Sequence, residues 1–89
     1  MEQIIQELRQ DFINDLPNAL DSIISSHMAG DMEALFQAVH KLKGAAGVCQ
    51  HDKVVMLCDN YCEALREKRY NDIDLYHGEL ILALGEIDN

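Results

Sequence analysis

Apolar residues recur at the three- and four-residue spacing of an α-helix through nearly all of this 89-residue sequence. No segment shows the strict alternation and β-branched richness that is typical of a strand. The periodicity therefore predicts an all-α fold. A chain of this length can bury one modest core, and it contains no repeat, low-complexity segment or linker. We expect residues 1–89 to form a single domain.

The apolar stripes divide the N-terminal third of the chain into two segments. Ile5, Leu8 and Phe12 mark a short helix, and the stripe from Leu16 to Ile24 marks a second one. Pro17 lies near the join, and the first turn of a helix tolerates proline. The sequence predicts a short additional N-terminal helix, and it leaves open that the two segments run on as one kinked helix.

Three further helices follow along the chain. Gly30 and Asp31 are typical of a helix C-terminus followed by an N-cap, so the next helix is expected from about Asp31 to about Val48. Apolar positions then predict helices over 54–65 and 73–87. Because the loops are short, consecutive helices should lie antiparallel. The expected architecture is an antiparallel four-helix bundle with the short N-terminal helix added to it.

The balance of charge narrows the possible partners. Sixteen acidic residues against seven basic ones give a net charge of −9, which repels nucleic acid and anionic lipid. No stretch approaches the roughly 18 apolar residues that a membrane span needs, and no charged leader precedes an apolar run. We therefore expect a cytoplasmic protein that binds neither nucleic acid nor a membrane.

The three cysteines form an odd set without the paired CxxC spacing of a structural zinc site. Cys58 and Cys62 lie one helical turn apart, so a histidine could join them in a metal site. No complete set of ligands is evident in the sequence. We therefore interpret the cysteines as reduced, mostly buried helix residues and expect no metal.

One histidine lies outside the apolar stripe of its helix. On a wheel of 100° per residue, His40 falls roughly 130° from the centre of the stripe over 35–46, so its ring should point to solvent. Two glycines on its flank each cost about 1 kcal/mol in helix stability relative to alanine, which indicates that something must approach the ring closely. The neighbours on this flank, one or two turns away, are Phe36, Gln37, Lys43, Gly44 and Gly47.

These residues suit a histidine that carries a phosphoryl group reversibly. Imidazole titrates close to neutral pH, so an uncharged fraction can attack phosphorus. Lys43 would offset part of the phosphoryl charge, and Gly44 would leave room for that group and for an incoming active site. No further acid, base or metal cluster accompanies His40, so a partner must supply the rest of the chemistry. We interpret His27, His51 and His77 as surface histidines or as buried ones with satisfied hydrogen bonds.

The stretch from Ala38 to Gly47, AVHKLKGAAG, resembles the His-x-x-Lys-Gly signature helix of histidine phosphotransfer (HPt) domains. Asp15-Leu16-Pro17, the turn over 29–31 and Leu57-Cys58 also resemble typical positions of that family, so the resemblance covers most of residues 12–67. It implies a four-helix bundle in which His40 is phosphorylated on a ring nitrogen. It also implies exchange of that group with an aspartate of a receiver domain that holds Mg²⁺.

One position departs from the family pattern. Many HPt domains place a Gln or Glu on the following helix near the phosphorylated ring, and counting without gaps assigns that place to Cys62, a poor hydrogen-bonding substitute. Gln37 or Glu63 could take a related role, and the spacing does not decide between them.

A docking surface is expected around His40. Its candidate residues are Phe36, Gln37, Lys41 and Gly47. Phe36 lies at the edge of the apolar stripe, so it is equally well explained as a plain core residue or as part of the apolar surface on which a receiver docks.

The expected function is that of a phosphorelay intermediate, which carries a phosphoryl group on His40 from one receiver aspartate to another. Such a protein is a carrier rather than an autonomous enzyme, and we expect a monomer whose partners are response-regulator receivers, a hybrid histidine kinase, or both. Two alternatives remain: a helical interaction module that is never phosphorylated, and a small metal-binding protein using Cys58 and Cys62. The initiating Met and the compact length favour a free-standing protein over a fragment of a hybrid kinase.

Overall fold

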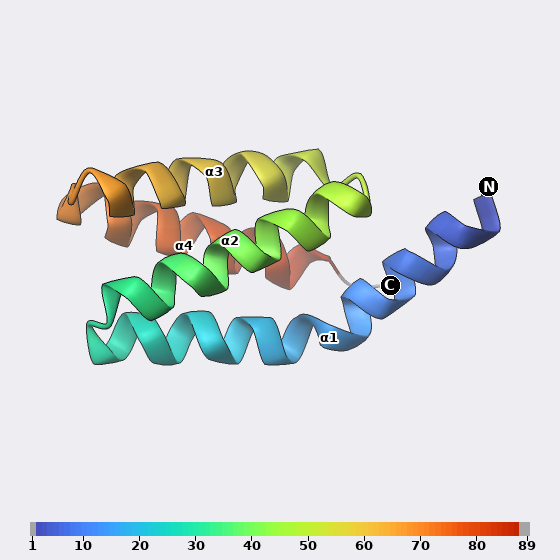
Figure 1. Ribbon diagram of the computed structural model, residues 1–89, viewed down its shortest axis with the longest axis horizontal. Helices are drawn as coiled ribbons and strands as arrows, with labels where there is room; N and C mark the ends of the chain where they lie inside the picture. The colour runs from blue at the N-terminus through green and yellow to red at the C-terminus, as the bar shows by residue number, and fades with distance from the viewer. Residues whose placement is uncertain (1, 88–89) are drawn as a thin grey trace.

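The computed structural model describes the backbone of residues 2–87 and the side chains of residue 7 and of residues 9–87. The described chain is entirely helical between its turns, which confirms the all-α prediction. Its helices are α1 (Glu2–Ala29), α2 (Met32–Val48), α3 (Asp52–Arg66) and α4 (Tyr70–Glu86). Figure 1 shows that each helix runs antiparallel to the one before it, in an up-and-down order.

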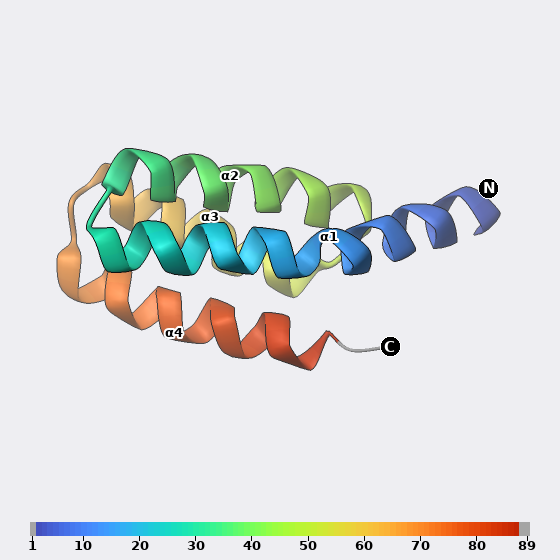
Figure 2. The same cartoon turned by 90° about the horizontal axis from the view of Figure 1, so that it is seen from below.

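The N-terminal third of the chain is one helix rather than two. The helix α1 continues from Glu2 to Ala29 with Pro17 inside it, so a separate short N-terminal helix is not seen. Figures 1 and 2 show that the first part of α1 bends and extends beyond the bundle. Proline gives up a backbone hydrogen bond to the preceding turn, which is an ordinary cause of such a bend. The expected positions Ile5 and Leu8 lie outside the described side chains.

Each of the three turns closes in the same way. One residue in each turn, one or two positions after the end of the helix, adopts a left-handed backbone, with φ of 71° at Gly30, 62° at Gln50 and 58° at Lys68. The next backbone N–H then donates to a carbonyl of the last helical turn, as Asp31 does to Ser26 at 3.1 Å. The Asp31 carboxylate also accepts from the backbone N–H of Ala34 at 3.1 Å, so the predicted N-cap is confirmed. These compact turns fix how far each helix is shifted along its neighbour.

The core is built from the predicted apolar stripes. From α2 it takes Leu35, Val39, Leu42 and Ala46, all of them buried. The other helices contribute Phe12, Leu16 and Ile23 from α1, Val54, Leu57, Tyr61 and Leu65 among others from α3, and Ile73, Leu80, Ala83 and Leu84 from α4.

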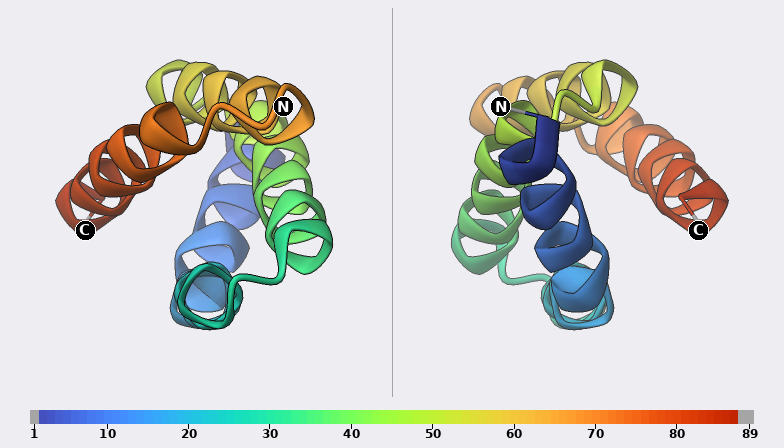
Figure 3. Two further views of the ribbon diagram at one scale, coloured as in Figure 1. Left: turned by 90° about the vertical axis from the view of Figure 1, so that its left-hand side faces the viewer. Right: turned by 90° about the vertical axis from the view of Figure 1, so that its right-hand side faces the viewer.

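The four helices do not close evenly around this core. Helices that follow one another in the chain pack closely, whereas α1 and α4 make fewer contacts and diverge in the end-on views of Figure 3. The helix α2 therefore lies between α1 and α3, and its outer face remains open. None of the described helices combines the length and the apolar character that crossing a membrane needs.

Candidate functional site

The imidazole of His40 lies on the exposed face of α2, as the sequence predicts. Of the four histidines, His40 is the only one that is exposed. Its ring is parallel to that of Phe36, one turn earlier, with 5.9 Å between the centroids and 6° between the planes. This contact leaves the His40 ring open to solvent and limits its freedom on one side.

Phe36 lies partly in the core and partly on the surface beside His40. Its side chain is half-buried and packs against the core, and it also lies beside His40. The guanidinium of Arg66, from the last turn of α3, lies over the Phe36 ring at 5.9 Å from the centroid. Cation–π contact of this kind is attractive. It adds a cation to the region around His40 in a chain whose net charge is −9.

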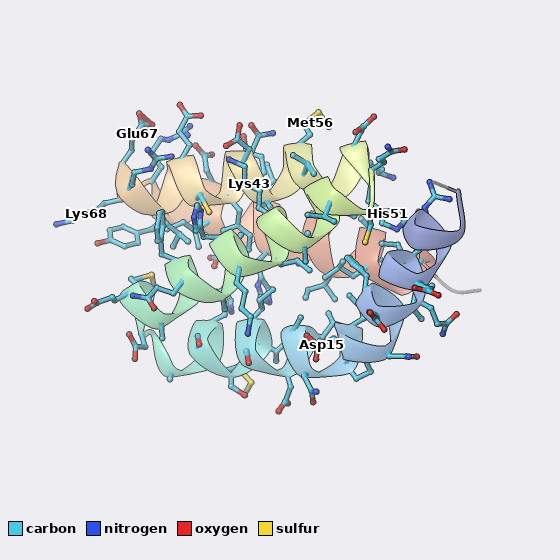
Figure 4. All side chains as sticks on the ribbon, turned by 45° about the vertical axis from the view of Figure 1, so that its right-hand side comes forward. Asp15, Lys43, His51, Met56, Glu67 and Lys68 are labelled. Carbon is cyan, nitrogen blue, oxygen red and sulfur yellow. The ribbon has the colours of Figure 1, made fainter. Side chains whose placement is uncertain are left out.

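The ammonium of Lys43 is held by an acidic residue of the neighbouring helix. Its Nζ lies 2.7 Å from Oδ1 of Asp59 on α3, and Figure 4 shows Lys43 on the side of α2 that faces α3. The hydrogen bond to Asp59 raises the pKa of Lys43, and the same bond lowers the pKa of Asp59. Both groups are therefore charged at neutral pH and attract each other. Asp59 is not among the site residues predicted from the sequence.

The contacts between α2 and α3 follow one register. Phe36 meets Arg66, Lys43 meets Asp59, and Gly47 faces Val55, and the residue numbers of the partners add up to the same value in each pair. The same register sets Cys62 opposite His40. Counting along the family pattern without gaps likewise assigned Cys62 to the position near the His40 ring.

Cys62 has little to offer the His40 ring. Its side chain is only 2% exposed, and burial raises the pKa of its thiol, so it stays a neutral and weak hydrogen-bonding group. The two alternative supports, Gln37 and Glu63, are both exposed. Gln37 also lines the groove described below.

The two glycines after His40 are not required by packing within the chain. A Cβ added at Gly44 would meet no atom within 4 Å, and one added at Gly47 would make only an ordinary contact of 3.9 Å with Val55. Glycine inside a helix is nevertheless unfavourable. The open surface that the glycines leave beside His40 is therefore available to a molecule from outside.

A groove of about 800 Å³ runs along α1 and α2 and includes His40 in its wall. It brings together four predicted site residues, Phe36, Gln37, His40 and Lys41, and it leaves Lys43, Gly44 and Gly47 outside its wall. The facing wall comes from α1, whose part in a site the sequence indicated only through the likeness of Asp15-Leu16-Pro17 to the family. Figure 4 shows Asp15 on that helix. The α1 residues of the wall are Phe12, Asp15, Leu16, Asn18, Ala19 and Ser22.

The remaining histidines are partly buried. The rings of His27 and His77 stack on each other, with further contacts to Asp74 and Tyr61, so both are satisfied as expected. For His51 the expectation is wrong. Its ring packs against Phe12 at 5.1 Å, and its Nε2 is buried without a hydrogen-bond partner. Because His51 directly precedes α3, its ring reaches Phe12 of α1.

All three cysteines are buried, as predicted. Within the described residues, no three His, Cys, Asp or Glu side chains come together in a way that could hold a metal ion. The alternative of a metal site around Cys58 and Cys62 therefore receives no support from the geometry.

Comparison with known proteins adds one match. The sequence model of the Hpt domain family matches residues 7–89, nearly the whole chain. Neither a search of curated proteins nor a search of solved structures finds a significant match. The matched range includes α1 from residue 7 onwards, the whole of α2, α3 and α4, and the neighbourhood of His40. The chain therefore belongs to the Hpt domain family, whose members take part in phosphotransfer in two-component signalling and interact with receiver domains.

Proposed function

We propose that this protein is a phosphorelay intermediate whose phosphoryl carrier is His40. The observation that best supports this proposal is that His40 alone among the four histidines is exposed. It lies beside two glycines whose surface is open to a second molecule. The family match supports the class of chemistry. Beyond that match, we propose that His40 is the phosphorylated residue and that the group arrives from one receiver and passes to another.

The transfer step exchanges one bond to phosphorus for another. The uncharged imidazole of His40 attacks the phosphorus of a receiver aspartyl phosphate in line with the leaving oxygen. A P–N bond forms as the P–O bond breaks, the aspartate leaves as a carboxylate, and the ring carries a positive charge until its other nitrogen releases a proton. Attack by the carboxylate of a second receiver reverses these changes.

The residues around His40 indicate which part of the transfer this protein performs and which part the receiver performs. Lys43 is within reach of an anion on the ring because residues three positions apart are neighbours on a helix. The partner receiver would supply Mg²⁺ and most of the charge stabilisation of the transition state. This protein acts as a carrier, and the groove beside His40, with Phe36, Gln37 and Lys41 in its wall, offers an apolar docking surface.

The test is a labelling experiment with receivers of the source organism. Each receiver is phosphorylated with a radioactive label, supplied with Mg²⁺ and mixed with the protein. We expect acid-labile label on the wild type, none on His40→Gln, and undiminished label on the matched control His27→Gln. Binding of receivers without any label on the wild type would instead favour an interaction module. Label that persists in His40→Gln would assign the chemistry to another residue.

A further inference from the structure

We propose that Asp59 weakens the hold of Lys43 on a phosphoryl group carried by His40, so that the group passes more readily to the next receiver. This inference rests on the proposed function and concerns the regulation of the same site. It makes Asp59 a positioning residue, since it acts through Lys43 and not on the phosphorus itself.

The geometry of the pair is well defined. Lys43 Nζ and Asp59 Oδ1 lie 2.7 Å apart, and the two side chains are 33% and 58% exposed. The contact follows the same register of α2 against α3 that brings Phe36 to Arg66, so it belongs to the packing of the two helices. Lys43 therefore points towards α3 with its ammonium in contact with a carboxylate.

His40 and Asp59 then compete for one cation. A lysine ammonium is a compact point charge with three donors, and Asp59 takes one donor and offsets the charge. A phosphoryl group on His40 would place about two negative charges one helical turn away from Lys43. It would be attracted by Lys43, and this attraction is weaker while the Asp59 carboxylate holds the ammonium. The carboxylate thus lowers the net electrostatic gain from placing the phosphoryl group on this protein.

The other charged and polar groups near Lys43 do not cancel this effect. Cys62 lies between the helices as a neutral buried thiol, because burial raises its pKa. Arg66 is a cation, but its guanidinium lies over Phe36. Removing the Asp59 charge should therefore leave Lys43 free to serve the phosphoryl group.

The chain offers a matched control pair away from the site. Lys53 and Glu86 form another exposed ion pair between α3 and α4, with 3.7 Å between Nζ and Oε2. Glu86→Gln removes the same charge from another interhelical ion pair, and neither Lys53 nor Glu86 lies in the groove beside His40.

The experiment measures the equilibrium of the phosphoryl group between His40 and the receiver that labels the wild type best. Equimolar protein and receiver are incubated with Mg²⁺ until the ratio of phosphohistidine to aspartyl phosphate is constant. For Asp59→Asn we expect that ratio to rise about two- to fivefold at low salt, the scale of an exposed ion pair, and the rise to shrink as salt is added. Asp59→Glu should restore the wild-type ratio, and Glu86→Gln should not change it.

A double-mutant cycle separates action through Lys43 from direct repulsion. In a Lys43→Met background, Asp59→Asn should leave the ratio unchanged, because the shared cation is gone. A second readout needs no phosphotransfer. The pKa of the Lys43 ammonium, followed by NMR of its side chain, should fall in Asp59→Asn, since the hydrogen bond to Asp59 raises it.

The outcomes distinguish this inference from the proposed function. A wild type that takes no label overturns the proposed function and this inference with it. A labelled wild type whose ratio is unchanged or lower in Asp59→Asn overturns this inference alone. A rise that persists in the Lys43→Met background also overturns it, because Asp59 would then act directly on the phosphoryl group.

Discussion

The imidazole rings of His27 and His77 stack face to face, with centroids 3.8 Å apart and planes within 7° of parallel. This stack joins α1 to α4, the two helices that diverge from each other elsewhere in the bundle. Asp74 Oδ1 lies 3.1 Å from Nε2 of His27, and the Tyr61 hydroxyl lies 2.8 Å from Nδ1 of His77. The contact between α1 and α4 therefore includes His77, an imidazole whose pKa the fold shifts.

The stability of the fold should fall as the pH drops below neutral. Burial, and then the neighbouring charge of His27, hold the pKa of His77 below its ordinary value of 6.5. The unfolded chain therefore binds a proton at a higher pH than the folded one. The stabilising contribution is complete above about pH 6.5 and is lost as the pH falls through the lower pKa of the folded state. We expect a lower urea midpoint of unfolding at pH 5.5 than at pH 7.5.

Two histidine variants test the origin of this pH dependence. His77→Gln cannot be protonated, so its urea midpoint should change less between the two pH values than that of the wild type. His40→Gln removes an exposed histidine outside the stack and should keep the wild-type dependence. Equal dependence in the wild type and in His77→Gln would contradict the assignment to the stack.

Glycine at position 44 should lower the stability of the protein and keep His40 accessible to a receiver. Replacing a glycine by alanine inside a helix gains about 0.5–1 kcal/mol of unfolding free energy where the new Cβ meets nothing, as at Gly44. The same Cβ stands beside the ring where a receiver must approach, so Gly44→Ala should slow phosphotransfer by about tenfold or more. Unfolding in urea and the rate of label transfer are the two measurements.

The chain contains a matched control for Gly44. A Cβ at Gly78, in α4, also meets no atom within 4 Å. Gly78→Ala should therefore stabilise the protein by a similar amount and leave the transfer rate unchanged. If both variants transfer at the wild-type rate, Gly44 has no part in the approach of the partner.

The aromatic ring of Phe36 should matter for docking more than for the chemistry. It is half-buried, lies in the wall of the groove and carries Arg66 over its face. Aromatic anchors of this kind commonly contribute more than about 1 kcal/mol to binding, so Phe36→Ala should weaken receiver binding by about tenfold. Binding is measured by titration with an unphosphorylated receiver at a temperature at which circular dichroism confirms the fold.

Met56 provides the comparison for Phe36. It is an exposed apolar residue of α3, and it does not line the groove beside His40. Met56→Ala should bind the receiver as the wild type does. If the two variants bind equally well, the receiver docks on another face.

Much of the fold is predictable because the helices repeat one signal over many residues. The stripes that define the buried faces of α2, α3 and α4 are long, so their existence and order follow from periodicity. The first turn is marked by Gly30, which takes a left-handed backbone easily. The other two turns use Gln50 and Lys68 in the same conformation. Neither residue type indicates such a turn, so the sequence cannot place these turns as sharply.

The candidate site divides in the same way between local and long-range information. The exposure of His40 and its proximity to Phe36 and Lys43 follow from the geometry of one helix. Asp59 and Arg66 come from α3, and finding them needs the register of two helices, which the turn around Gln50 sets. A gap-free count against the family pattern assigned the place near His40 to Cys62, but it gave no indication of Asp59. The α1 wall of the groove depends on packing between helices, which periodicity alone does not fix.

The buried thiol of Cys58 should react only when the fold opens. Its side chain has no exposed surface, and burial raises its pKa from 9.0 to about 12. A shift of that size lowers the thiolate fraction near pH 8 by about a thousandfold, and only the thiolate attacks an alkylating reagent. We expect iodoacetamide to label Cys58 slowly in the native protein and rapidly in urea, with the site read by mass spectrometry. Leu80→Ala, which removes a fully buried side chain at a cost of about 2–5 kcal/mol, should speed the native reaction. Labelling of native Cys58 as fast as in urea would show that α3 does not bury this thiol in solution.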